Sequence, residues 1–168
     1  MAPDWFVVNA RDAQWFENDR TGSYTTFERG ERFEQIGIGI GILQPGQANA
    51  QYHAESAQED FLVLAGECLL LIEGQERHLR QWDFVHCPPD TPHIFVGAGD
   101  GPCLVLAVGA RFPGRTIRFP VDEVALRHGA GVEEETDSPR EAYEGFPQDH
   151  PIDCPLEAHF RRYSRTRC

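Results

Sequence analysis

A short polar segment carries the side chains best suited to bind a metal ion. It reads HAESAQED and contains His53, Glu55 and Glu59, and an apolar run that Gly66 ends follows at once. A second isolated histidine, His93, stands further along in PPDTPH, between a strand-like run and a turn. Imidazole nitrogens and carboxylate oxygens are common ligands of divalent first-row metals. Two histidines and one glutamate would hold such an ion and leave coordination positions open.

The segments around these residues have the pattern of short β-strands. Residues 32–43 alternate strictly, with isoleucines on one face and glycines on the other, and this period indicates a strand. We expect the isoleucine face to be buried and the glycine face to pack closely, with a bound ligand as the alternative. Turn residues separate further strand-like runs at 59–65, 67–72, 77–80, 83–87, 94–96 and 103–108. Short strands with frequent turns predict an all-β sandwich or barrel.

The chain divides into a strand-rich part and an extension. Residues 1–110 form the predicted β-barrel domain, including N-terminal strands at Trp5–Val8 and Tyr24–Phe27. After Arg111 the apolar density falls and proline recurs. Residues 111–168 are too poor in apolar residues for an independent domain, so we expect them to pack on the barrel or on a partner subunit.

Composition limits the classes of partner. The 168 residues include 27 acidic and 15 basic side chains, and the net charge of −12 argues against a surface that follows nucleic-acid phosphates. No stretch has the length of a transmembrane helix, and the N-terminal residues do not resemble a signal peptide. The five cysteines include no C-x-x-C pair. We therefore expect a cytoplasmic protein with no membrane or nucleic-acid partner.

Two groups of residues resemble the two sequence motifs of the cupin superfamily. The first motif is matched by Gly46, His53-Ala54-Glu55, Glu59 and Gly66. The second motif is matched by Trp82-Asp83, Phe84–Cys87, Pro88, Asp90 and His93. The resemblance spans roughly residues 36–108 and implies a cupin barrel, which is a double-stranded β-helix or jelly roll. Trp82 and Asp90 stand at glycine positions of the second motif, and we interpret both changes as structural.

Glu55 departs from the first motif, because it stands where the second histidine usually stands. Two roles are open for it: a fourth metal ligand, or a residue beside the ligand set that could act as a base. The spacing of His53, Glu59 and His93 is similar to that of hydroxyanthranilate dioxygenase, a cupin with a His-Glu-His iron site. That similarity is restricted to the three ligands, since the substrate-binding arginine of that enzyme has no match here.

The resemblance implies a mononuclear metal enzyme, dioxygenase-like, that acts on a small organic molecule. Isomerase or lyase chemistry fits the same site. Iron(II) or manganese(II) suits the anionic ligand set best, while zinc or nickel would also bind. Tyr52, beside His53, and Phe61 and Val63, which share strand parity with Glu59, are predicted to line the pocket.

Two alternatives come from other classes. A non-catalytic cupin could bind a metal or small molecule as a sensor or sequestering protein. In a cupin that has lost its metal, each surviving ligand would be a hydrogen-bonded polar residue at the barrel mouth. Whatever its function, we expect the protein to form a homodimer, because related cupins commonly pair and exposed apolar strands are stabilised when a partner buries them.

Overall fold

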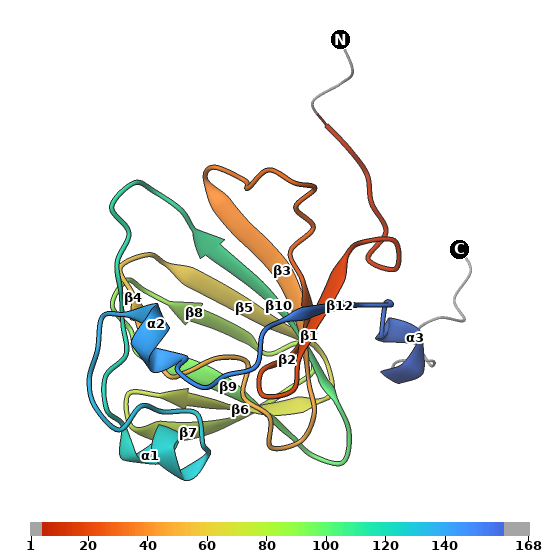
Figure 1. Ribbon diagram of the computed structural model, residues 1–168. Helices are drawn as coiled ribbons and strands as arrows, with labels where there is room; N and C mark the ends of the chain where they lie inside the picture. The colour runs from red at the N-terminus through yellow and green to blue at the C-terminus, as the bar shows by residue number, and fades with distance from the viewer. Residues whose placement is uncertain (1–4, 160–168) are drawn as a thin grey trace.

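The computed structural model describes residues 5–159 and consists mainly of two antiparallel sheets (Figure 1). The larger sheet has the order β12 (His150–Ile152), β1 (Trp15–Asn18), β2 (Gly22–Thr25), β3 (Ile36–Leu43), β10 (Cys103–Ala110), β5 (Glu59–Ala65) and β8 (Phe84–Cys87). The smaller sheet has the order β7 (Gln75–Arg80), β6 (Glu67–Ile72) and β9 (His93–Ala98). A separate two-stranded ladder joins β4 (Ala54–Glu55) to β11 (Ile117–Arg118).

The two sheets bury one apolar core between them. In β5 the alternating sequence EDFLVLA buries Phe61, Val63 and Ala65, while the leucines between them are only partly buried. The core cluster draws on both sheets and comprises Leu43, Phe61, Val63, Cys68, Leu70, Val85, Cys87, Phe95, Cys103 and Val105. The predicted all-β architecture is therefore confirmed, as a sandwich of two sheets.

The glycine face of β3 points toward the interior, in the cross-strand rows of Glu59, Phe61 and Val63. A Cβ atom on Gly39 would lie 2.7 Å from a backbone oxygen, and one on Gly37 would meet a guanidinium group. A Cβ atom on Gly41, in contrast, would meet nothing within 4 Å. Close packing therefore explains two of the three glycines, and the third faces open space.

The isoleucine face of β3 lies on the outer side of the sheet, contrary to the expectation that it is buried. Only Ile42 is fully buried, and Ile36 is 46% exposed. The reason is that the chain pairs the glycine face with the inward residues of β10, which leaves the branched side chains outside. An apolar outer surface results.

Two positions that differ from the cupin motif have an unusual backbone conformation. Trp82 has a φ of 76° and Asp90 a φ of 64°, which is the left-handed region that glycine adopts most easily. A glycine at either position would relieve this backbone cost, which explains why the motif has glycine there. Both residues lie in turns of this chain, in agreement with a structural interpretation of both changes.

The segments that follow β10 lie against both sheets. They include the short helices α1 (Glu123–Arg127), α2 (Pro139–Ala142) and α3 (Leu156–His159), and residues 160–168 of the predicted extension lie outside the described range. Ala125 of α1 packs with residues of β6 and β9, and β12 adds an edge strand to β1. Within residues 5–159, no helix is long and apolar enough to cross a membrane.

The predicted strand at Trp5–Val8 is wrong. These residues have no regular secondary structure, and Trp5 is 73% exposed. Both edges of β1 are already occupied, by β2 and β12, so this earlier segment has no free edge there to pair with. Strand-forming residue types alone do not make a strand without a neighbour.

Gly97→Ala should destabilise the protein by about 2–3 kcal/mol, because overpacking a rigid position is costly. A Cβ atom there would lie 2.2 Å from the backbone oxygen of Gln44. Backbone hydrogen bonds between Gly97 and both Gly46 and Gln47 prevent a compensating shift. Urea unfolding would measure the change, with Gly41→Ala as the matched control, since that position has free space. Equal stability of the two variants would contradict this account.

Candidate metal site

The two histidines of the predicted site lie directly opposite one another. His53 and His93 form an isolated antiparallel β-bridge, in which the N–H of His93 donates to the oxygen of His53 at 2.9 Å. His53 immediately precedes β4 and His93 begins β9, so the bridge joins two distant parts of the sequence. Neighbouring residues in such a bridge bring their side chains together on one face. The two rings are 5.4 Å apart between centroids.

Backbone carbonyls fix the orientation of both imidazole rings. Nδ1 of His53 lies 2.7 Å from the oxygen of Gln51, and Nδ1 of His93 lies 2.9 Å from the oxygen of Thr91. A carbonyl oxygen only accepts hydrogen bonds, so each Nδ1 carries the proton. Each Nε2 is therefore left with a free lone pair. A carbonyl that holds the other ring nitrogen is the usual support of a metal-binding histidine.

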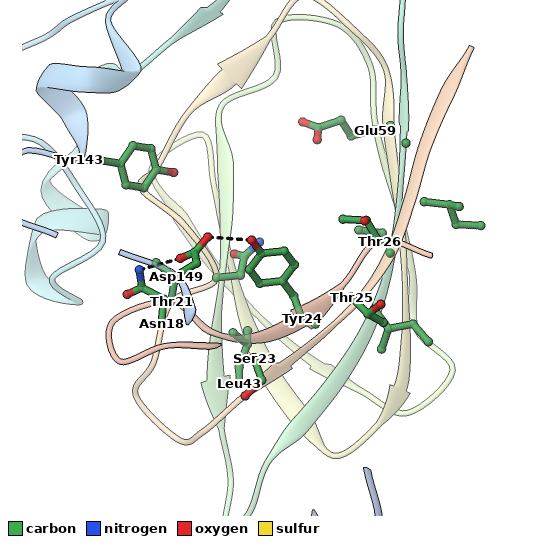
Figure 2. A pocket seen from close by; sticks show the side chains of 18 of the residues that line it. Asn18, Thr21, Ser23, Tyr24, Thr25, Thr26, Leu43, Glu59, Tyr143 and Asp149 are labelled. Atoms are coloured by element: carbon green, nitrogen blue, oxygen red, sulfur yellow. Dashed lines mark hydrogen bonds between the residues drawn. The ribbon is translucent and has the colours of Figure 1, made fainter. Parts of the chain in front are cut away.

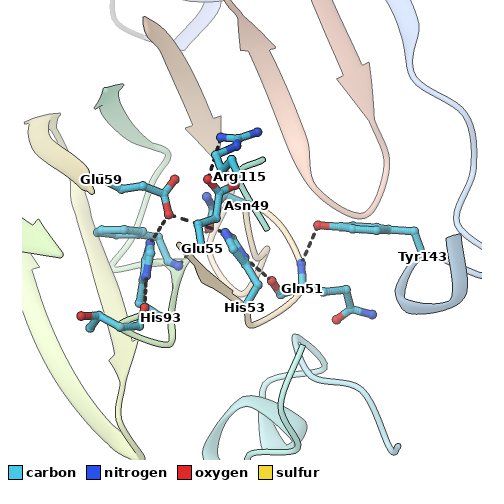
Figure 3. A network of polar contacts seen from close by, with 10 residues as sticks. Asn49, Gln51, His53, Glu55, Glu59, His93, Arg115 and Tyr143 are labelled. Carbon is cyan, nitrogen blue, oxygen red and sulfur yellow. Dashed lines mark hydrogen bonds and ion pairs between the residues drawn. The ribbon is translucent and has the colours of Figure 1, made fainter. Parts of the chain in front are cut away.

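Glu59, the first residue of β5, completes a compact group of three donor atoms (Figure 3). Its Oε2 lies 3.9 Å from Nε2 of His53 and 3.6 Å from Nε2 of His93. One donor atom from each residue lies within 4.8 Å of the others. A divalent ion with bonds of about 2.0–2.2 Å fits among donors at such separations. The structure thus brings His53, Glu59 and His93 together, with chemistry that suits a metal.

Burial keeps the three groups close to uncharged in the absence of a cation. Desolvation lowers the pKa of His53, and it lowers the pKa of His93 to about 4. Both imidazoles are therefore neutral at pH 7, which is the form that binds metals. Desolvation, reinforced by the charge of Glu55, raises the pKa of Glu59 to about 7. A bound divalent cation would supply the positive charge that this buried carboxylate lacks.

Glu55 lies beside the group but forms an ion pair with Arg115. Its Oε2 accepts a hydrogen bond from the guanidinium of Arg115 at 2.6 Å (Figure 3). The β4–β11 ladder produces this contact, because it pairs Glu55 with Ile117, two residues after the arginine. Burial raises the pKa of the Glu55 carboxyl, and the charge of Arg115 opposes that rise. Of the two roles left open by the sequence, this geometry favours a carboxylate beside the ligand set.

Glu55→Gln should therefore retain the metal. We expect the variant, loaded with manganese(II) and dialysed, to bind as much metal as the parent. The affinity should fall by about tenfold, the lower end of the range for residues that support a ligand, because the side chain of Glu55 contacts Arg115. Elemental analysis of the dialysed protein gives the result. A near-complete loss of manganese would instead make Glu55 a fourth ligand.

The three residues predicted to line the pocket lie in the apolar core. Tyr52 is 2% exposed and packs with residues of β6, β9 and α1. Phe61 places its ring 5.2 Å from that of His93 and so supports the histidine from behind, while Val63 is fully buried in the main core. Strand parity correctly placed Phe61 and Val63 on the inner face, but the interior is filled with side chains at both positions.

A cavity of about 750 Å³ opens on the side of Glu59 that faces β3 (Figure 2). The described residues that line this cavity do not include the three predicted ones, Tyr52, Phe61 and Val63. The cavity extends over the glycine face of β3 to β2 and to the segment that precedes β12. Its walls include Glu59, Gly41, Gly109, Arg111, Arg115, Tyr24, Tyr143 and Asp149.

Sequence reasoning missed the polar residues of this cavity other than Glu59. Arg115 reaches Glu55 across 60 positions of sequence, and Tyr24 reaches Asp149 across 125. Neither pair belongs to a local motif, and each depends on a short strand pairing that joins distant segments. The glycine face of β3 was the one signal that pointed to this space.

Comparisons with known proteins agree with the fold. The family model of the cupin domain matches residues 39–109. One similar solved structure is a sugar phosphate isomerase from a cupin superfamily, from Silicibacter pomeroyi, which is 25% identical with a TM-score of 0.51. The match covers 64% of this chain and 66% of that chain, so this chain spans slightly under two thirds of the length of that protein. The polyketide cyclase RemF from Streptomyces resistomycificus is 16% identical with a TM-score of 0.56, over 66% of this chain and 83% of that chain. No curated protein matches the sequence.

Proposed function

Because residues 39–109 are a cupin domain, we propose that this chain is a mononuclear metal enzyme that acts on a small organic molecule. The observation that carries the proposal is the convergence of His53, Glu59 and His93 within 4.8 Å of one another. Both histidines are held in the metal-binding tautomer, and the carboxylate opens onto a cavity large enough for a substrate.

The three ligands and the residues beside them would have different roles in such an enzyme. His53, Glu59 and His93 would hold a divalent ion, and that ion would supply Lewis-acid chemistry to the substrate. Glu55 is a carboxylate outside this set whose charge acts on Glu59, and it serves as the proton acceptor, with the atom Oε1 free of the contact with Arg115. Arg115 keeps the carboxylate in place and lines the cavity.

Two reaction classes fit this arrangement. The sequence favours a dioxygenase, because two histidines and one carboxylate leave open positions for substrate and dioxygen on iron(II). An isomerase is the second candidate, since the Silicibacter pomeroyi protein, at 25% identity, is a sugar phosphate isomerase. In this chain, both classes would use the same three ligands and the cavity beside them.

Metal content and oxygen uptake test the proposal together. We expect iron or manganese in the purified protein, or after loading, and its loss in the His53→Ala variant. Oxygen uptake with catechol-type and carboxylate substrates would identify a dioxygenase, and interconversion of sugar phosphates without oxygen uptake would identify an isomerase. Bound metal with no turnover of either kind would favour a sensor or sequestering cupin. Failure to bind any divalent metal would refute the proposal.

The outer face of the larger sheet supports a homodimer. A row of apolar side chains crosses four strands, through Ile40, Leu106, Leu62 and Phe84. Phe84 at the end of this row is 64% exposed. An apolar surface of this kind suits a second copy of the chain, while the net charge of −12 supports small-molecule rather than nucleic-acid partners. The predicted cytoplasmic location is compatible with both.

Phe84→Glu should therefore shift the protein from dimer to monomer. A charge buried in an apolar interface costs several kcal/mol when it has no partner, whereas on a monomer this residue faces water. Light scattering after gel filtration gives the mass of each species. A parent protein that is already monomeric, or a variant that stays dimeric, would rule out this face.

A further inference from the structure

The cavity reaches well beyond the candidate metal ligands. Cross-strand pairing puts Gly37 in the row of Glu59 and puts Gly41 in the row of Tyr24. These two glycines are four residues apart on β3, a separation of about 13 Å at the usual rise of a strand. A Cβ atom on Gly41 would meet nothing within 4 Å, so the space is open at the far row.

The far end of the cavity has an ordered polar pair. The hydroxyl of Tyr24 donates to Oδ2 of Asp149 at 2.7 Å (Figure 2). Nδ2 of Asn18 donates to Oδ1 of the same carboxylate at 2.9 Å and to the oxygen of Pro147 at 2.8 Å. The pairing of β12 with β1 holds Asp149 next to these partners. Figure 2 shows Glu59 and this polar pair on different sides of the cavity.

This pair can accept hydrogen bonds from a ligand but has none to donate. The proton of Tyr24 is committed to Asp149, which leaves lone pairs on the phenol oxygen and on the carboxylate. Burial, with the hydrogen bond to Asp149 and its charge, raises the pKa of Tyr24 to about 12, so the phenol stays neutral at pH 7. A ligand group at this end therefore needs an O–H or N–H bond, and a carboxylate or phosphate would face the charge of Asp149.

We propose that the cavity binds an elongated molecule that chelates the metal beside Glu59 and presents a hydroxyl or amino group to the Tyr24–Asp149 pair. Gly41 sets the width available to the end of the molecule beside Tyr24. The inference rests on the proposed function, because the first end of the molecule is held by the metal. It adds the length, the polarity and the uncharged or cationic character of the second end.

Hydroxamic acids with different tails can test the second end separately from the first. Hexanohydroxamic acid, 6-hydroxyhexanohydroxamic acid and adipic acid monohydroxamate share one chelating group and end in a methyl, a hydroxyl and a carboxylate. Titration calorimetry on the manganese-loaded protein would measure each affinity, with acetohydroxamic acid as the probe of the metal alone. We expect the hydroxyl-ended compound to bind about fivefold more tightly than the methyl-ended one, and the carboxylate-ended compound to bind weakest.

Two variants and a control locate the effect in the cavity. Asp149→Ala should remove the preference for the hydroxyl and raise the affinity for the carboxylate-ended compound, because the charge is gone and the proton of Tyr24 is released. Gly41→Val should weaken all three six-carbon compounds by about tenfold or more and leave acetohydroxamic acid unaffected. Gly101→Val is the matched control, since a Cβ atom there also meets nothing within 4 Å but lies outside the cavity.

The outcomes separate this inference from the proposed function. If manganese and acetohydroxamic acid bind but the three longer compounds bind equally, the inference is wrong and the metal site stands. The same follows if Asp149→Ala leaves the order of affinities unchanged, or if Gly41→Val weakens the short and long compounds alike. If neither manganese nor another divalent metal binds, the proposed function fails and this inference falls with it.

Discussion

The His93→Ala variant is expected to lose its divalent metal. His93 supplies one of the three converging donor atoms, and its ring is 2% exposed, so no other described residue can take its place without rearrangement. Removing a residue that merely supports a ligand costs about 10–100-fold in metal affinity. Removing a ligand from a set of three should therefore cost at least about 100-fold, and manganese should dialyse away.

Thermal unfolding with and without metal gives a second measurement. At a metal concentration about 100 times the dissociation constant, binding stabilises the folded parent by about 2.7 kcal/mol. For a domain of this size, that corresponds to a rise in Tm of roughly 5–10 °C. The variant should show no such rise. Each protein is compared with itself, so a lower stability of metal-free His93→Ala does not affect the result.

His86→Ala is the matched control for this prediction. His86 lies on β8 only a few positions before the site, but its side chain is 50% exposed and pairs with Asp60 at 2.7 Å. It should retain both the metal and the rise in Tm. An undiminished metal content in His93→Ala, or loss of metal in both variants, would place the metal elsewhere or show that its binding is nonspecific.

The sequence was sufficient to predict the central strands of the sandwich and the three converging side chains, but not β1 or β12. Alternation in β3 and β5 identifies strands directly. His53, Glu59 and His93 fall at positions of the two cupin motifs, and the spacing within each motif reflects the turn between neighbouring strands. A spacing cannot tell whether a side chain finds a partner elsewhere. The ion pair between Glu55 and Arg115 depends on a ladder of only two residues per strand, which leaves no periodic signal in the sequence.

The substrate cavity was less accessible to prediction, for a related reason. Its position depends on the lack of side chains on the inner, glycine face of β3. Only the packing of other segments decides whether each of these glycines is covered. Thr25 covers Gly39, while Gly41 stays open. The polar pair of Tyr24 and Asp149 likewise forms because β12 returns to the edge of β1, far from the motif.

The metal-free Glu59→Gln variant should be more stable than the metal-free parent at pH 8. Burial raises the pKa of Glu59 from 4.5 to about 7, so the folded state holds a proton that the unfolded state releases. Between these two values the folded state binds more protons, and the stability contributed by this group therefore falls as the pH rises. Above pH 7 the folded protein must bury an ionised carboxylate, whereas a glutamine stays neutral at every pH. The difference in unfolding free energy between the variant and the parent should thus grow from pH 5 to pH 8, by about 2 kcal/mol.

Urea unfolding in the presence of a chelator, at pH 5 and at pH 8, measures this difference. The titration of the buried histidines affects parent and variant alike and so cancels in the comparison. Glu133→Gln removes the same charge from an exposed position and gives the baseline.

The same Glu59→Gln variant should gain no stability from added manganese, because it lacks the anionic ligand. These two results together would show that Glu59 lowers the stability of the metal-free protein and is needed to bind a cation. A residue with a purely structural role would give a more stable protein as glutamine, so the carboxylate would then be explained by the metal. A difference that does not change with pH would mean that Glu59 is not destabilised by burial, and the argument for a cation at this position would then depend on the geometry of the two histidines alone.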